Sequence, residues 1–348
     1  MPANPPDPRQ PTTGPARRCA RDGACRCRRA AHASDLDALL TDPQFSGHLL
    51  RGNASAVGPH LPLLDQIVGV TVAGPVILND VGVHETPTVM GGPIRCRPGR
   101  VSLRLHPDHL GAALVSEPAA QAPPMLRLFD TDGNTAHATY LTETSDRLAF
   151  EAIGLSVDRF SSEADGAAEA DGASEVGGAD VSDVDNADEA PRVIVCSDDA
   201  LDDQVTQLDS ILADGGVSRL ASMPAREGFA RIDSRQAIAA LEHAALHTVE
   251  LTMAAAAPGC VQLHHDQLDG AREQEGQMLL ASGRARAMIN FNLVTECWVT
   301  WTQGVWGPTG SIEIYDRHAR CGMVITQTGA VPPAMFDAWD HLMTELAA

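Results

Sequence analysis

One Ala-rich stretch carries the side chains best spaced for metal chemistry. His243, His247 and Glu250 follow one another at i, i+4 and i+7, so a helix over 234–253 would place all three on one face, where they could hold a divalent metal. Apolar residues such as Leu241 take the other side, which is also typical of a helix with a solvated polar face. The pattern favours the solvated face and leaves a metal sensor as the lesser hypothesis.

A second set of metal-ligating residue types lies near the N-terminus. Cys19, Cys25, Cys27 and His32 could form a four-ligand zinc site, but their spacing matches no common zinc module. The surrounding residues are rich in Pro and Arg and have little apolar surface to bury, so the sequence favours a disordered Arg- and Cys-rich arm over 1–34. A chain of this length does not need disulfides, and we expect reduced thiols.

Two predicted strands carry polar side chains that could line a cavity. In VSLRL at 101–105, Arg104 either points into solvent from an edge strand or places its guanidinium in a pocket, where it could meet a carboxylate or an iron-bound ligand. In GCVQLHHD at 259–266, Cys260 and His264 share one face. That polar face could line a cavity, although the pattern favours the wet side of a half-exposed sheet.

Composition and missing motifs exclude several classes of protein. The chain has no P-loop, GxSxG, HExxH or strand-linked GxGxxG motif, which argues against nucleotide binding and hydrolysis. Its 46 acidic residues stand against 25 Arg and no Lys, and this formal net charge of −21 argues against nucleic acid as a partner. We find neither a membrane-spanning apolar run nor a signal peptide, and therefore expect a cytoplasmic protein with no membrane insertion.

The 348 residues suggest two domains separated by an acidic linker. Within the linker, 161–191, ten acidic residues and no basic ones alternate with small residues, and such a segment cannot bury enough apolar area to order itself. It divides the ordered chain into an N-terminal half over 35–160 and a C-terminal half over 192–348.

The two halves repeat each other at an offset of 186 residues. LRLFDTDGN begins at Leu126 and IEIYDRHAR at Ile312, which places Asp130 over Asp316, and RLAFEAI falls over PAMFDAW in the same register. Each half reads as helix, several hairpin strands and a closing helix. The sequence therefore predicts an α+β fold with two tandem homologous halves, each a large antiparallel sheet flanked by helices.

Several blocks in these halves resemble the haemin-degrading factor family of the HemS and ChuS type, which includes the ChuX-type domain. Their order and spacing match that family over nearly the whole ordered chain. The blocks are GVHE at 82–85, VSLRLHPDHL at 101–110, LRLFDTDGNTAHATYL at 126–141, GVSR at 216–219, EGFARIDSRQAIAALEHAA at 227–245, GCVQLH at 259–264, ECWV at 296–299 and SIEIYD at 311–316.

The resemblance implies that haem lies between the two halves. It assigns Arg104 to the distal face of the iron, as a catalytic and haem-binding residue, and Arg219 to the haem propionates. The family's proximal His falls at Thr206, which is a poor ligand for ferric haem. One of His84, His106, His109 or His264 is therefore expected to supply the axial ligand, and His106 shares the Arg104 face if that strand continues.

The resulting hypothesis is a cytoplasmic haem-binding protein for iron acquisition. Such a protein takes haem from a membrane importer and carries it or opens the macrocycle oxidatively with electrons from an external donor, and whether it is an enzyme stays open. The alternative is a non-catalytic binding or regulatory descendant that has lost iron ligation, because fold alone does not establish function.

Overall fold

The structure is a computed structural model that describes residues 34–50, 54–117, 123–164 and 201–348, within one compact unit, Ser34–Ala348. The hypothetical zinc ligands Cys19, Cys25, Cys27 and His32 lie outside the described residues, as does the acidic linker beyond Ala164. Among the helices that are described, none is long and apolar enough to cross a membrane.

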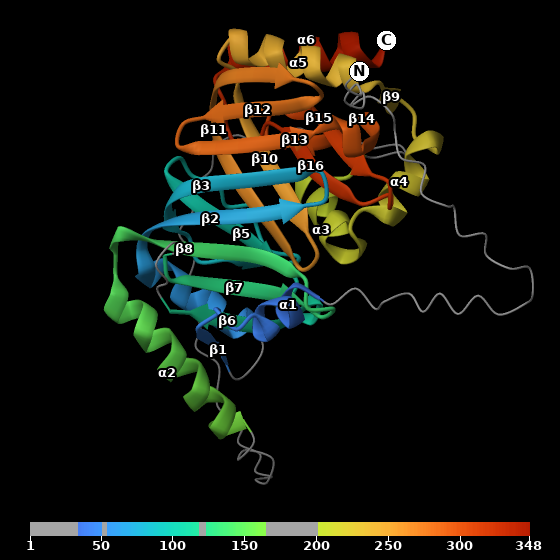
Figure 1. Ribbon diagram of the computed structural model, residues 1–348. Helices are drawn as coiled ribbons and strands as arrows, with labels where there is room; N and C mark the ends of the chain where they lie inside the picture. Colours follow the sequence, from blue (N-terminus) through green and yellow to red (C-terminus); the bar gives the residue numbers. More distant parts are fainter. Residues whose placement is uncertain (1–33, 51–53, 118–122, 165–200) are drawn as a thin grey trace, which may run out of the picture. The chain divides into compact units, whose positions relative to one another are not determined.

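The helices and strands fall into two similar series (Figure 1). The first series is α1 (Asp35–Thr41), β1 (Gly47–Leu50), the 3-10 helix η1 (Ala54–Leu64), β2 (Asp65–Ala73), β3 (Val76–His84), β4 (Thr88–Val89), β5 (Arg100–Leu105), η2 (Pro107–His109), β6 (Leu110–Ser116), β7 (Met125–Asp130), β8 (Thr135–Ser145) and α2 (Arg147–Ala164). The second series is α3 (Gln204–Asp214), α4 (Val217–Ser222), η3 (Met223–Ala225), β9 (Ala230–Ile232), α5 (Ser234–Leu246), β10 (Glu250–Ala257), β11 (Cys260–Gln274), β12 (Gln277–Ser282), β13 (Ala285–Asn290), η4 (Phe291–Leu293), β14 (Val294–Gly304), β15 (Gly307–Asp316), β16 (Cys321–Thr326) and α6 (Pro333–Ala347).

The strand order repeats, with one exchange between the repeats. One row reads β1-β6-β7-β8-β2-β3-β13-β12 and the other β9-β14-β15-β16-β10-β11-β5-β4, so each position in one row has its sequence counterpart in the other. The exchanged strands are β13, which pairs with β3, and β5, which pairs with β11. Figure 1 shows the first row passing from the blue strand β3 of the first repeat to the orange strand β13 of the second. The predicted α+β duplication is confirmed, but each sheet is completed by strands of the other repeat.

The turn after β7 and the turn after β15 are equivalent in detail. Asp130 Oδ1 accepts hydrogen bonds from the backbone N–H groups of Asp132 and Asn134, and Asp316 Oδ1 accepts them two and four residues further on, from His318 and Arg320. Each Asp thereby satisfies the amides of a tight hairpin turn. The register predicted from the two Asp residues is confirmed.

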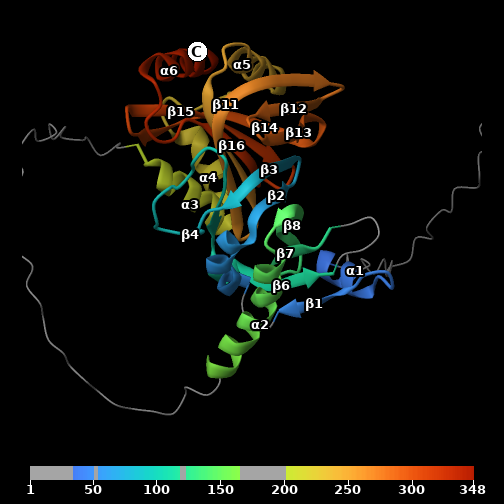
Figure 2. The ribbon, with the colours of Figure 1, turned by 90° about the vertical axis from the view of Figure 1, so that its left-hand side faces the viewer.

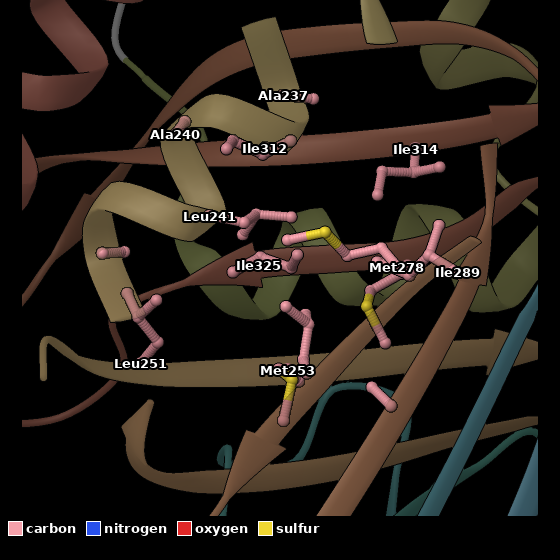
Figure 3. Close-up of a cluster of buried hydrophobic side chains, with 14 of the residues drawn as sticks. Ala237, Ala240, Leu241, Leu251, Met253, Met278, Ile289, Ile312, Ile314 and Ile325 are labelled. Atoms are coloured by element: carbon pink, nitrogen blue, oxygen red, sulfur yellow. The ribbon is translucent and has the colours of Figure 1, made fainter. Parts of the chain in front are cut away.

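Apolar clusters hold the two ends of the fold together. Beneath α5 and α6, Leu241 packs with Met253, Ile314 and Ile325 in the cluster drawn in Figure 3. A second cluster under η1 and α2 includes Leu61 and other residues of the first repeat. Each cluster lies between a sheet face and the helices that cover it, so the strands that face it bury at least that side.

The metal site considered as the lesser hypothesis for the Ala-rich helix is wrong, because α5 is shorter than predicted. Thr248 adopts a left-handed conformation with φ 49°, which ends the helix, and Glu250 already belongs to β10. Glu250 Oε1 is joined by a hydrogen bond to His265 Nε2 at 2.9 Å. In the part of the chain that the structure describes, no group of three metal-ligating side chains is assembled.

Candidate functional site

Arg104 lies on the face of β5 that is turned toward α3. Its side chain is fully buried, and Nε donates to Asp209 Oδ1 of α3 at 2.6 Å while Nη1 donates to the Gly92 carbonyl oxygen at 2.8 Å. Nη2 has no hydrogen-bond partner. A buried guanidinium needs a compensating negative charge, and here α3 of the second repeat supplies it to a strand of the first.

Asp209 has a second contact that ties the same helix to the segment before β5. Its Oδ2 accepts a hydrogen bond from the Gly91 backbone N–H at 2.8 Å. The carboxylate therefore joins both Arg104 and the β4–β5 segment to α3. Figure 2 shows α3 and α4 on the side of the sheets away from β2 and β3. The Asp209 carboxylate therefore holds α3 against this side.

A cavity of about 360 Å³ opens beside the first turn of α3. It is lined by Ile94, Cys96, Asp203, Gln204, Val205, Gln303, Gly304, Val305, Thr328 and Gly329. Asp203 caps the helix by accepting from the Thr206 backbone N–H at 2.7 Å. That hydrogen bond lowers the pKa of Asp203, and the charge of Arg104 adds to the effect, so the guanidinium acts on the cavity wall.

Cys96 is the lining residue that sequence reasoning missed. It has a side-chain type that coordinates haem iron in other proteins, and it comes after the GVHE block on a segment with no periodic pattern. Burial and then the nearby Glu85 carboxylate raise the pKa of its thiol, so the free protein holds Cys96 protonated.

The inner side of α3 and α4 rests on an apolar floor. Leu208, Ile211 and Leu212 of α3 pack with Val261 of β11 and Trp298 of β14, and this cluster extends to Met90 and Ile94 before β5. The helix pair therefore covers the sheet through a layer of apolar side chains, next to the hydrogen bond between Arg104 and Asp209.

Arg219 of α4 is buried and forms an ion pair with the Glu313 carboxylate. Its Nε and Nη2 both contact Glu313 Oε1, at 3.0 and 2.7 Å. Glu313 also accepts hydrogen bonds from the side chains of Thr300, Gln207 and Tyr315. Burial alone would raise the pKa of Glu313, but the charge and hydrogen bonds of Arg219 lower it, so the pair is ionised. Arg219 thus anchors α4 to the sheet.

His84 and His264 lie on the opposite side, in the interior between the sheets. His84 Nε2 is joined to Thr139 Oγ1 at 2.9 Å, and burial lowers the pKa of His84 to about 4. His264 Nδ1 is joined to Asp80 Oδ2 at 2.8 Å and its Nε2 to Ser282 Oγ at 3.1 Å. The expected wet face of GCVQLHHD is wrong, because β2 and β3 of the first repeat lie against it: Gln262 donates to the Gly69 carbonyl oxygen and His264 contacts Asp80.

His106 and His109 lie beyond the end of β5. The strand ends at Leu105, so His106 does not continue the Arg104 face, and its ring stacks on that of His109 with centroids 3.9 Å apart. His109 lines a cavity of about 220 Å³ at the opposite end of α3, beside Asp214. The structure therefore places Arg104 beside α3, His109 at its far end, and His84 and His264 behind the sheet.

No protein-family model matches this chain, and no curated protein matches it in sequence. Among solved structures, apo-PhuS, a haem-binding protein from Pseudomonas aeruginosa, aligns with a TM-score of 0.64 and 18% identity over 89% of each chain. The haem-degrading enzyme ChuS from Escherichia coli O157:H7 aligns with a TM-score of 0.63 and 13% identity over 86% of this chain and 87% of its own. The resemblance seen in the sequence blocks is thus confirmed for the fold, and this chain has the fold of PhuS and ChuS.

Proposed function

We propose that this protein binds haem as cargo, between β5 and the first turn of α3. The observation that carries the proposal is Arg104, a fully buried guanidinium that meets α3 and whose Nη2 has no hydrogen-bond partner among the described residues. Buried unsatisfied donors are rare, and this one lies where the resemblance assigns the distal side of the iron. The haem-binding function of PhuS, whose fold the chain shares, supports the same assignment.

Haem binding at this position requires a local exchange of partners. Asp209 holds both Arg104 and the Gly91 amide, so a ligand that enters between them must release α3 from the β4–β5 segment. Arg104 would then exchange the carboxylate for the distal side of the haem. Bound haem supplies an iron centre, and the contribution of this chain is to enclose it in an apolar layer and aim one cation at it.

Two side chains at the ends of α3 are candidates for the axial ligand. Thr206 is exposed on the first turn of α3, where the resemblance expects a proximal His. Cys96 lines the cavity at that turn, while His109 lines the cavity at the other end of α3. That a histidine coordinates the iron stays a prediction, and His109 is the member of the set best placed to contact a ligand beside α3.

A haemin titration followed by absorbance tests the proposal. The wild type is expected to give a saturable Soret band, and Arg104→Ala is expected to weaken binding by about tenfold. Thr206→His should tighten binding and give a His-ligated spectrum, whereas Thr344→His, on an equally exposed helical Thr of α6, should change nothing. Cys96→Ser and His109→Ala test which residue coordinates the iron in the wild type: the variant that lacks the native axial ligand should lose the absorbance spectrum typical of that ligand.

A haem site of this kind suits a protein that handles imported haem. We place the protein in the cytoplasm, receiving haem from an importer, and any oxidative opening of the ring would need an external electron donor. Loss of the Soret band with release of iron, when a reductant is added to the loaded protein, would identify degradation. An unchanged band would identify a carrier.

A second candidate is a binding or regulatory descendant that has lost haem ligation. It is favoured by one observation: Arg104 and Arg219 are both paired with carboxylates of this chain, Asp209 and Glu313. If neither the wild type nor Thr206→His binds haemin saturably, this candidate replaces the first.

A further inference from the structure

The closing helices α2 and α6 occupy equivalent places, but α6 fills the space beneath it with large side chains. Trp339 of α6 is buried and its Nε1 donates to the Gly310 carbonyl oxygen at 2.8 Å. Met343 packs so closely on Gly310 that a Cβ there would lie 2.4 Å from its Cγ, and Trp301 closes the same space. The second repeat therefore has a filled interface at this point.

The first repeat has smaller residues at the corresponding positions. The 186-residue offset places Ile153 where α6 has Trp339. In the strands the pairing register decides the correspondence: Val115 pairs with Leu126 as Val299 pairs with Ile312, so Glu117, two residues on, takes the place of Trp301. Two indole rings are thus replaced by an aliphatic and an acidic side chain. A cavity of about 450 Å³ lies between α2 and the sheet, within the volume range of small-molecule sites.

The lining of this cavity divides into a mostly apolar floor and a mostly polar rim. The buried lining residues, which form the floor, are Val115, Ser116, Pro124, Leu141 and Phe150. The more exposed lining residues, which form the rim, are His48, Glu117, Arg147, Glu151, Gly154 and Leu155. Such a division suits a molecule with an apolar body and one polar end.

The rim carries two carboxylates, Glu117 and Glu151, and two basic side chains, Arg147 and His48. Glu117 accepts a hydrogen bond from Ser46 Oγ at 2.6 Å. Arg147 and His48 form no ion pair or hydrogen bond within the described chain, and His48 Nε2 lies at the helix surface, 3.4 Å from where a Cβ on Gly154 would be. An Arg fork without a carboxylate partner is suited to an incoming carboxylate.

We propose that the first repeat binds a medium-chain carboxylate in this cavity, with its chain on the apolar floor and its head group at Arg147. The site is separate from the proposed haem site, which lies beside α3 of the second repeat.

Titration calorimetry of the full chain with decanoate tests the charged end. The wild type is expected to bind one decanoate saturably, and Arg147→Gln should weaken binding by about fivefold. Arg272→Gln, at an exposed Arg away from the cavity, should leave binding unchanged. Decanol should bind more weakly than decanoate, and equal affinity for the two would overturn the carboxylate assignment.

A cavity-filling variant tests the location. Gly154→Leu places a side chain at the rim and suits a helix, so it should fold and abolish binding, whereas Ala152→Leu on the exposed face of α2 should not. Protein preloaded with haemin should bind decanoate with unchanged affinity. Absence of saturable binding in the wild type or equal binding by both Leu variants would refute the proposal, and neither outcome depends on whether the haem site exists. Competition by haemin would refute the separate location of the site.

Discussion

Glu313 Oε1 is a shared acceptor for Arg219 of α4 and Gln207 of α3, with Arg219 Nη2 and Gln207 Nε2 both 2.7 Å away. A single carboxylate on β15 therefore fixes two helices onto the sheet. Glu313 is fully buried, so removing its charge leaves Arg219 desolvated without a counterion.

Glu313→Gln is expected to destabilise the protein by about 3–5 kcal/mol, which is typical of breaking one side of a buried ion pair. Urea unfolding followed by far-UV circular dichroism measures the loss. Glu345→Gln, at an exposed position of α6, is the control and should change stability by less than about 0.5 kcal/mol. A loss of similar size in both variants would contradict a structural role for the pair.

Asp209→Asn should favour haem binding. The amide cannot neutralise Arg104, so the guanidinium becomes free for an incoming ligand, and haemin affinity is expected to rise by about threefold to tenfold. Asp337→Asn, on the surface of α6, should leave affinity unchanged. Weaker binding by Asp209→Asn would show that the carboxylate helps to hold the ligand site together.

Stability should fall in mild acid because His84 and His137 are buried as neutral rings. Burial lowers the pKa of His84 to about 4 and lowers that of His137 well below its usual value. The unfolded chain therefore binds more protons than the folded one below about pH 6.5, and the stability from His84 is lost as the pH falls from there to about 4.

His84→Gln measures this contribution. The slope of unfolding free energy against pH between 6.5 and 4 should be flatter than in the wild type by up to about 1.4 kcal/mol per pH unit. His341→Gln, at an exposed His on α6, should keep the wild-type slope. Identical slopes in all three proteins would mean that His84 is protonated in the folded state.

Gly310→Ala should destabilise the second repeat, because its Cβ would lie 2.6 Å from Met343 Cβ. The expected loss is about 1–3 kcal/mol, as for other overpacked cores. Met343→Ala keeps Cβ but removes Cγ, the atom nearest to the new methyl at 2.4 Å, so the double variant should lose less than the sum of the two single losses. Additive losses in a thermal-unfolding cycle would show that Gly310 has another role.

The sequence predicted the features that depend on local pattern. The matching turns at Asp130 and Asp316 revealed the duplication, because their side chains satisfy amides only a few residues away. Features that depend on distant pairing could not be predicted. The polar face of His264 looked solvent-exposed, since the local pattern contains no sign that Asp80 of β3, 184 residues earlier in the chain, would lie against it.

For the candidate site, the sequence predicted the two Arg residues but not the carboxylates that pair with them. Alternation identified Arg104 as a residue that either faces water or enters a pocket, but its partner Asp209 lies 105 residues away on a helix of the other repeat. The position of Arg219 was identified from its block, whereas Glu313, which neutralises it, stands in a strand whose alternation gives no sign of the contact.

The exchange of β5 and β13 makes the two repeats interdependent. A fragment ending before residue 165 would keep β5 without β11 beside it, and would leave β3 without β13. Exposed strand edges of this kind recruit another chain, so the fragments 34–164 and 201–348 should recognise each other when mixed. The arrangement is the one that a strand-swapped homodimer would have, here with both copies in a single chain, so that each copy meets its partner without a second molecule.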